Sequence, residues 1–322
     1  MVGDSPWAGV KVLVTGARGF IGSHLCRRLC EAGSIVHATS RSKMAVGVDG
    51  PRWWQGDLAD VQTARSLIAE IKPEVIFHLS GAVGASPNID LVLPTFLSLL
   101  TSTVNVLTLG TESGCRRVVL VASLTEPERG ESEPTPGSPY AAAKWASGAY
   151  GRMFHRLYDT PCVTVRPFMV YGPGQNPEKL IPAVTNSFLR GEAARLSSGQ
   201  WKADWVYIDD IVEGFLQAAI TPKIEEATID LGSGTLVSVR EVVERLCAVI
   251  GGKGKPLFGA LPDRPFEQVR VADTVATYSR IGWKAVTPLE SGLCRTVEWY
   301  RNRWLSQQLP KRSSLSTSSF RK

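Results

Sequence analysis

The chain is expected to fold as an α/β protein built on a doubly wound parallel sheet. Two observations predict this fold: short apolar segments alternate with helical stretches, and the first apolar segment leads through a glycine turn into a helix. The 322 residues, 43% of them hydrophobic, suffice to bury a large core, and a charged content of 20% is that of an ordinary folded chain.

The stretch Val10–Gly22, VKVLVTGARGFIG, contains the first strand, the turn and the start of the helix. Gly16, Gly19 and Gly22 follow the strand at a three-residue spacing. The first glycine permits a tight turn, the second lets the backbone approach a diphosphate, and the third lets the helix pack closely on its strand. The helix N-terminus then presents free N–H groups to the phosphates. The stretch predicts a Rossmann dinucleotide site, with a merely structural turn as the alternative.

The periodicity places the remaining elements and the domains. Strands are expected at Ile35–Thr39, Trp53–Gln55, Val75–Leu79, Val118–Ala122 and Val163–Arg166, and helices at Phe20–Cys30, Val61–Ile71, Thr95–Thr111, Tyr140–Tyr158 and Ile211–Ile220. Past Gly172 the regular alternation is lost. We expect a Rossmann domain over 1–171 to which segments near 204–232 return, a smaller, partly interleaved substrate domain over 172–308, and a disordered Ser-rich tail over 309–322.

Charge and cysteine content narrow the classes of function. A net charge of +6 and a pI near 9.0 allow nucleic-acid binding, but a basic surface that serves an anionic small substrate explains them equally, and no nucleic-acid partner is expected. No apolar run approaches about eighteen residues, so no membrane partner is expected. The cysteines Cys26, Cys30, Cys115, Cys162, Cys247 and Cys294 lack CxxC spacing. They are expected to be buried, reduced thiols of a cytoplasmic protein without a metal site.

The end of the second strand bears on the choice of cofactor. An NAD site usually has an acidic residue about twenty residues beyond the glycine loop, whereas this chain has Ser40 and Arg41 there. Arg41 can form a fork of charge-assisted hydrogen bonds with a 2′-phosphate, Ser40 can add another, and Arg18 can lie near the same group. The pattern favours NADP(H) over NAD(H), with an ordinary solvated basic loop as the other interpretation.

Two further positions in this half have competing interpretations. Asp57 ends the third strand, where its carboxylate can accept a hydrogen bond from the adenine amino group or cap the next helix. His78 is interpreted as a core histidine rather than a catalyst.

The chemistry is expected on the helix that opens at Tyr140. Tyr140 and Lys144 are four residues apart and share one helix face, which brings the ammonium near the phenol. A phenol with a pKa near 10 is a poor base at neutral pH, so a cation must favour its ionised form. Ser123 and Thr125, just after the preceding strand, offer hydroxyl groups beside the same site.

Four motifs in order resemble one known family. The segments GARGFIG, YAAAK, RPFMVYGPGQ and DWVYIDDI are similar to those of the extended short-chain dehydrogenases/reductases, specifically the nucleotide-sugar epimerase/dehydratase group, and the resemblance runs from Val10 to Trp304. It implies Tyr140 as acid/base, Lys144 on the nicotinamide ribose, and a hydroxyl residue that polarises the sugar carbonyl. It also implies a homodimer formed through the helices Thr95–Thr111 and Tyr140–Tyr158.

The chain departs from the family pattern at two places. Leu124 stands where the family's usual catalytic hydroxyl belongs, so the role falls to Ser123 or Thr125, with Ser123 preferred. Ala203 replaces an arginine before Asp204, and Lys202 can substitute as a point charge. Arg264 matches another family arginine that reaches the diphosphate, and Asn105 is expected to organise the site locally. Asp209 and Asp210 are interpreted as helix N-caps rather than as a catalytic pair.

The motifs together predict two sets of contacts and a choice of functions. The residues expected to contact the dinucleotide are Gly16, Arg18, Gly19, Phe20, Ile21, Gly22, Ser40, Arg41, Asp57, Leu58, Leu79, Ser80, Gly81, Tyr140, Lys144 and Pro167, and those expected to contact the substrate are Val83, Ser123, Tyr140, Asn176 and Arg264. The first functional hypothesis is an NADPH-dependent reductase of a nucleotide-linked 4-keto(-6-deoxy) sugar. The alternative is an NAD(P)-dependent nucleotide-sugar 4-epimerase, and a third is a catalytically silent cofactor-binding member of the family.

Overall fold

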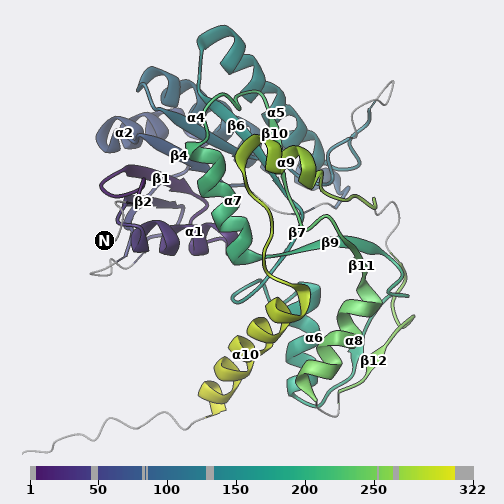
Figure 1. Cartoon of the computed structure of the whole chain (residues 1–322). Helices are drawn as coiled ribbons and strands as arrows, with labels where there is room; N and C mark the ends of the chain where they lie inside the picture. Colours follow the sequence, from purple (N-terminus) through teal and green to yellow (C-terminus); the bar gives the residue numbers. More distant parts are fainter. Residues whose placement is uncertain are drawn as a thin grey trace, which may run out of the picture.

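The computed structural model describes residues 5–44, 50–81, 84, 86–127, 134–251, 254–263 and 268–308. Within these residues the largest sheet has seven strands in the order β10-β6-β5-β4-β1-β2-β3 (Figure 1). Its strands are β1 (Lys11–Thr15), β2 (Ile35–Ser40), β3 (Arg52–Gln55), β4 (Val75–His78), β5 (Arg117–Val121), β6 (Cys162–Pro167) and β10 (Thr228–Leu231). All neighbouring pairs are parallel, which confirms the expected doubly wound α/β fold.

Helices cover both faces of this sheet. On one face lie α1 (Phe20–Glu31) and α7 (Ile208–Ile220), and on the other lie α2 (Val61–Ile71), α4 (Ser102–Glu112) and α5 (Pro139–Tyr158) (Figure 1). Successive side chains of a strand point to opposite faces of the sheet. Val12 and Val14 therefore pack into the core under α1 and α7, while Leu13 packs into the core under α2, α4 and α5. All three side chains are fully buried, as expected of a central strand covered on both faces.

The later part of the chain builds smaller sheets and a second group of helices. A mixed sheet joins β11 (Leu236–Ser238), β9 (Lys202–Tyr207) and β7 (Met169–Tyr171), and β12 (Pro256–Leu257) pairs with β8 (Ala194–Arg195). The helices α6 (Leu180–Leu189), α8 (Val239–Ile250) and α10 (Leu289–Gln308) pack on one another, away from the large sheet (Figure 1). Helix α9 (Thr274–Ile281) lies against β10. The domain boundary at residue 171 stays a prediction.

The helix expected over Thr95–Thr111 is not one regular helix. The structure has a 3₁₀ turn η1 (Ile89–Leu91), a short α3 (Val92–Thr95), a π-helical segment η2 (Phe96–Thr101) and then α4. Beside η2, Ser102 Oγ donates to Ser98 O at 2.7 Å and Thr103 Oγ1 donates to Leu99 O at 2.6 Å. Such hydroxyl bonds compete with the backbone ladder and bend helices, which accounts for the irregular segment.

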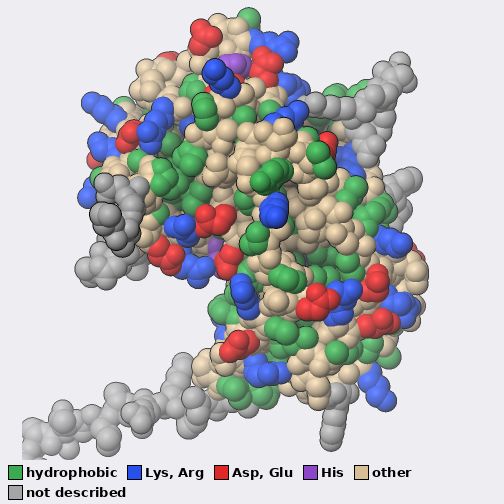
Figure 2. Space-filling view, in the orientation of Figure 1, with side chains coloured by type: hydrophobic (Ala, Val, Ile, Leu, Met, Phe, Trp, Pro, Cys, Tyr) green, Lys and Arg blue, Asp and Glu red, His purple; other side chains and the backbone are tan. Residues whose placement is uncertain are grey.

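Two expectations from composition need correction. Of the helical stretches in the described part of the chain, Ile89–Glu112 is long and apolar enough to cross a membrane by length and composition, with 33% of its most apolar window buried, so the statement that no such run exists is wrong. The same stretch packs against α2 and α5. All six cysteines are free, but Cys294 is exposed, so the expectation that all are buried is also wrong. Figure 2 shows basic and acidic side chains interspersed over the visible face.

Candidate active site

The glycine turn joins β1 to α1 under tight steric limits. Gly16 has a φ of +67°, and a Cβ atom there would lie 2.7 Å from the carbonyl carbon of Leu79. A Cβ atom at Gly22 would overlap the carbonyl oxygen of Gly16. Only glycine fits these two positions, because the turn passes close to the end of β4 and α1 packs directly on the turn. The tight turn and the close packing of the helix expected at these glycines are therefore present.

The other predicted residues of this turn lie at the start of α1. Gly19 is the helix N-cap and has no side-chain cap, so the first N–H groups of α1 face the space beyond the turn. Arg18 is exposed, Phe20 contacts His24 edge to face, and Ile21 packs on the core. The arrangement offers a helix N-terminus and one guanidinium to an anionic group.

Strand β2 ends at Ser40, followed by the exposed side chain of Arg41. Ser42 N donates to Ser40 Oγ at 3.2 Å, and Gln55 Nε2 donates to Arg41 O at 3.2 Å. These bonds fix the loop backbone while the Arg41 guanidinium extends into solvent. Its placement at the carboxyl end of β2 fits a partner for a ribose phosphate.

In the loop after β3, the residue that caps the next helix is Asp60 and not Asp57. The N-cap of α2 is Asp60, whose carboxylate accepts from Thr63 N at 2.9 Å, so the interpretation of Asp57 as a helix cap is wrong. Asp57 is exposed and accepts from Ala59 N at 3.0 Å. Asn105 on α4 donates to the carbonyl oxygen of buried Leu58 at 2.9 Å, and so holds this loop locally.

His78 ends β4 inside a closed hydrogen-bond network. Its Nδ1 lies 2.9 Å from Thr15 Oγ1, and its Nε2 lies 3.2 Å from Thr103 Oγ1. Burial lowers the pKa of His78 to about 3, so the ring is neutral, as expected of a core histidine. Thr15 Oγ1 also accepts from Ser80 N at 3.1 Å, which ties the ends of β1 and β4 together. Leu79 and Ser80 thus lie beside the glycine turn, Gly81 lies against Leu99, and Val83 lies outside the described residues.

Lys144 projects from α5 toward the end of β5. Ser138 caps α5 by accepting from Ala141 N at 3.2 Å, and Pro139 occupies the first turn. Lys144 Nζ donates to Val121 O at 3.0 Å, and the side chain is buried. Burial lowers the pKa of Lys144 to about 8, partly opposed by the charge of Glu126. The amine is therefore mostly a cation at neutral pH.

Ser123, rather than Thr125, contacts the phenol of Tyr140. A side-chain hydrogen bond joins Ser123 to Tyr140, while Thr125 is exposed and lies 3.0 Å from Ser123, oxygen to oxygen. Leu124 packs on the core. Burial raises the pKa of Tyr140, the hydrogen bond from Ser123 lowers it, and the charge of Glu126 raises it. The structure thus brings Ser123, Tyr140 and Lys144 together at the carboxyl end of β5.

Glu126 and two arginines belong to this cluster and were not among the predicted site residues. Glu126 Oε1 accepts from Ser123 N at 2.6 Å, and Arg270 Nη2 donates to Glu126 O at 2.7 Å. Arg166 on β6 and Arg270 both act electrostatically on the Glu126 carboxyl, whose pKa burial raises. The spacing of three residues from Ser123, which allows a carboxylate to fold back on a backbone N–H, is the signal that could have found Glu126.

The residues expected on the substrate side are more scattered. Pro167 is buried at the end of β6 opposite Leu231, and Asn176 lies in the loop after β7, where its side chain accepts from Glu178 N at 2.9 Å. Lys202 is exposed at the start of β9. Arg264 lies outside the described residues.

The acidic residues around α7 are structural, though not as caps. The N-cap of α7 is Tyr207, so Asp209 and Asp210 lie inside the first turn and their interpretation as N-caps is wrong. Asp210 accepts from Thr287 N at 2.9 Å. Their negative charge still complements the positive end of the helix dipole.

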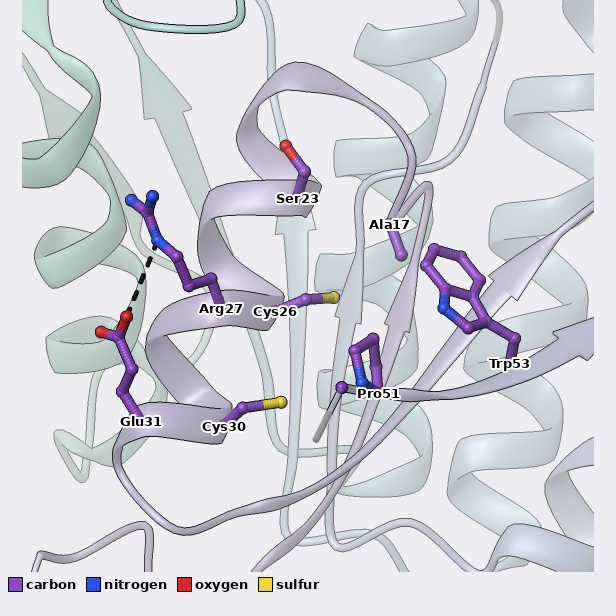
Figure 3. A pocket seen from close by; sticks show the side chains of 9 residues that line it. Ala17, Ser23, Cys26, Arg27, Cys30, Glu31, Pro51 and Trp53 are labelled. Carbon is purple, nitrogen blue, oxygen red and sulfur yellow. Dashed lines mark ion pairs between the residues drawn. The ribbon is translucent and has the colours of Figure 1, made fainter. Parts of the chain in front are cut away.

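A pocket of about 520 Å³ lies beside α1, near the glycine turn, and does not include the Tyr140 cluster. Figure 3 shows Cys26 and Cys30 pointing from α1 toward Pro51 and Trp53. Burial raises the pKa of Cys26 to about 12, so this thiol is not a nucleophile at neutral pH. No group of three or more metal-binding side chains occurs in the parts of the chain that the structure describes.

Comparisons with known proteins agree with this geometry. The model of the NAD dependent epimerase/dehydratase family matches residues 12–232. The chain is 31% identical to UDP-glucose 4-epimerase from Mycolicibacterium smegmatis, over 91% of this chain and 99% of the relative. The solved structure of UDP-glucose 4-epimerase from Thermotoga maritima superposes with a TM-score of 0.83 at 24% identity, over 91% and 99% of the two chains, which supports the fold.

A second solved structure is MoeE5 in complex with UDP-glucuronic acid and NAD. It superposes with a TM-score of 0.80 at 29% identity, again over 91% of this chain and 99% of that chain.

Proposed function

The chain belongs to the NAD-dependent epimerase/dehydratase family, as its motifs predict, and we propose that it is a nucleotide-sugar 4-epimerase. The observation that carries the proposal is the cluster of Ser123, Tyr140 and Lys144 at the end of β5. The full-length similarity to a UDP-glucose 4-epimerase supports the choice of reaction.

In this reaction Tyr140 is the acid/base. The phenolate of Tyr140 removes the proton from a sugar hydroxyl while the carbon that bears this hydroxyl is oxidised to a carbonyl. The phenol then returns a proton to the carbonyl oxygen when the carbonyl is reduced from its other face. Ser123 donates a hydrogen bond to the sugar oxygen where negative charge develops. Lys144 favours the phenolate through its positive charge and fixes the reacting groups in place.

The chain's residues fit a nicotinamide dinucleotide at the glycine turn. Gly16 and Gly22 let the turn pack closely against the end of β4 and the start of α1, and the uncapped N-terminus of α1 follows directly after this turn. When bound, the dinucleotide supplies a hydride acceptor and donor for the sugar carbon. We propose that NADP(H) is preferred over NAD(H), because Ser40 and Arg41 occupy the end of β2 where a carboxylate would repel a 2′-phosphate.

A second candidate is an NADPH-dependent reductase of a nucleotide-linked 4-keto sugar. The observation that favours it is the same Ser40–Arg41 pair, since NADPH is the dinucleotide that net reductions consume. The proton delivery by Tyr140 would be unchanged, but the cofactor would leave oxidised after each turnover.

One assay separates the two candidates. Purified protein is incubated with UDP-glucose or UDP-glucuronate, the sugars are resolved by chromatography, and a 4-keto-6-deoxyhexose nucleotide with NADPH is tested in parallel by absorbance. Formation of the 4-epimer without net NADPH loss supports the epimerase, whereas stoichiometric NADPH loss with the keto sugar supports the reductase. Tyr140→Phe is expected to retain dinucleotide binding and to lose turnover by at least about a hundredfold. Inactivity of the wild type in every assay would contradict both.

We further propose that the protein is a homodimer located in the cytoplasm. Apolar side chains of α3, η2 and α5 are exposed together, among them Leu93, Phe96, Leu97 and Trp145. Such a surface suits an isologous helix contact with a second copy. The free thiols suit a reducing compartment.

A further inference from the structure

Glu126 is placed by two hydrogen bonds at the centre of the candidate active site. Its Oε1 accepts from Ser123 N at 2.6 Å, which folds the carboxylate back toward the end of β5. Its backbone oxygen accepts from Arg270 Nη2 at 2.7 Å, so a distant segment of the chain holds the same turn. Ser123, which Glu126 holds through its backbone, is also the residue whose hydroxyl bonds to Tyr140.

Charged and titratable groups from three other segments act on this carboxylate. Among the described residues these are Tyr140 and Lys144 on α5, Arg166 on β6 and Arg270 in the segment before α9. Arg166 is itself shared, because its Nε lies 3.7 Å from Asp230 Oδ1. In such a partly buried cluster, charges are weakly screened and each one affects the protonation of its neighbours.

We propose that Glu126 is a positioning residue that sets the protonation state of Tyr140, by holding Ser123 in place and by its own negative charge. This inference deepens the proposed function and rests on it only in giving Tyr140 a catalytic role. The Glu126 carboxylate opposes the phenolate, whereas Lys144 favours it. At neutral pH, where Lys144 is mostly a cation, the two charges act on Tyr140 in opposite directions.

At alkaline pH, the effect of the Glu126 charge on the ionisation of Tyr140 can be measured separately from the effect of Lys144. Burial brings the pKa of Lys144 to about 8, so Lys144 is neutral in the range where a buried tyrosine ionises. Glu126 remains ionised there. Removing its charge therefore takes away a like charge from the phenolate without a competing change at Lys144, and Tyr140 ionises at lower pH.

The test is a tyrosinate absorbance titration of the full-length protein. Wild type and Glu126→Gln are each compared with the same protein carrying Tyr140→Phe, so that the difference reports Tyr140 alone. The amide oxygen of the introduced glutamine can still accept from Ser123 N, so Glu126→Gln removes the charge and keeps the turn. We expect the Tyr140 titration to shift to lower pH in Glu126→Gln and to return toward wild type in Glu126→Asp.

Two controls keep the result interpretable. Glu244→Gln, at an exposed position on α8, removes an equal charge far from the turn and is expected to leave the Tyr140 titration unchanged. Glu126→Ala removes both the charge and the acceptor of the Ser123 N hydrogen bond, so we expect its Tyr140 titration to lie at higher pH than that of Glu126→Gln. Because the titration needs no substrate, it stands even if the protein proves inactive as an epimerase.

Two outcomes would overturn the proposal. The first is a Tyr140 titration at the same pH in wild type and Glu126→Gln. The second is a shift to higher pH in Glu126→Gln, which would show that the carboxylate does not oppose the phenolate.

Discussion

Lys144 Nζ donates a hydrogen bond to the carbonyl oxygen of Val121, 3.0 Å away at the last residue of β5. The bond links α5 to the carboxyl end of β5, where the candidate active site lies. The ammonium is thereby held in one position, but it is also removed from water, and its burial brings its pKa to about 8. This position has a cost in stability that depends on pH.

That dependence gives the first prediction. Between about pH 8 and 10.5 the unfolded chain keeps the Lys144 proton that the folded chain has lost, so stability rises with pH in this window. Relative to Lys144→Met, the wild-type free energy of unfolding is expected to rise by up to about 3 kcal/mol from pH 8 to pH 10.5. Urea unfolding of both proteins at several pH values measures it. Groups common to both cancel, and a constant difference would contradict the shifted lysine.

The second prediction concerns the cofactor preference. Arg41→Asp replaces a cation by an anion at the end of β2 and is expected to weaken NADPH binding by at least about tenfold relative to NADH. Fluorescence titration of both dinucleotides gives the two dissociation constants. Lys43→Asp, two residues further along the same loop, is the matched control and should change the ratio less. A wild-type preference for NADH would refute the predicted phosphate contact.

The third prediction concerns assembly. Leu93 and Leu97 are 69% and 50% exposed, and they belong to the apolar surface of α3, η2 and α5. Light scattering of the wild type at micromolar concentration is expected to give twice 34.9 kDa, and the Leu93→Asp/Leu97→Asp variant to give a single copy. Val275→Asp, on exposed α9, should remain dimeric. A monomeric wild type would count against the interface.

The fourth prediction concerns Asp204, which joins three segments. Its carboxylate accepts from Ser233 N at 2.7 Å, Gly234 N at 2.9 Å and Ala272 N at 3.1 Å. An amide group in its place turns a donor toward these N–H groups, so Asp204→Asn is expected to lower the free energy of unfolding by about 3 kcal/mol. Thermal and urea unfolding measure the loss, with Glu244→Gln as an exposed control. Unchanged stability would show that the three segments are held by other contacts.

The sheet and the glycine turn were predictable because their causes are local. Buried apolar runs such as Val12–Val14 identify the strands, and Gly16 and Gly22 meet steric limits that depend on neighbouring backbone. The π-helical segment Phe96–Thr101 was not predictable from periodicity. It accompanies the side-chain bonds of Ser102 and Thr103, which compete with a helix pattern that the apolar residues still satisfy.

The sequence predicted the Tyr140 and Lys144 motif of the candidate site, but not the residues that surround this motif in the folded chain. Tyr140 and Lys144 stand four residues apart, and helix geometry alone places them together. The choice of Ser123 over Thr125 depended on the turn after β5, where Leu124 packs inward and Thr125 is exposed. Glu126 interacts electrostatically with Arg166 and Arg270, which are distant in sequence and come near it only in the folded chain.

The hydrogen bond from Arg270 to Glu126 O spans 144 positions of the sequence. The turn that carries Ser123 leaves the ribosome long before the residue that clamps it. The strands β1 to β6 precede Arg270 in the chain, but the turn that carries Ser123 acquires this hydrogen bond only after Arg270 has been synthesised. Synthesis in the N-to-C direction thus delays the completion of this turn until the segment that contains Arg270 has been made.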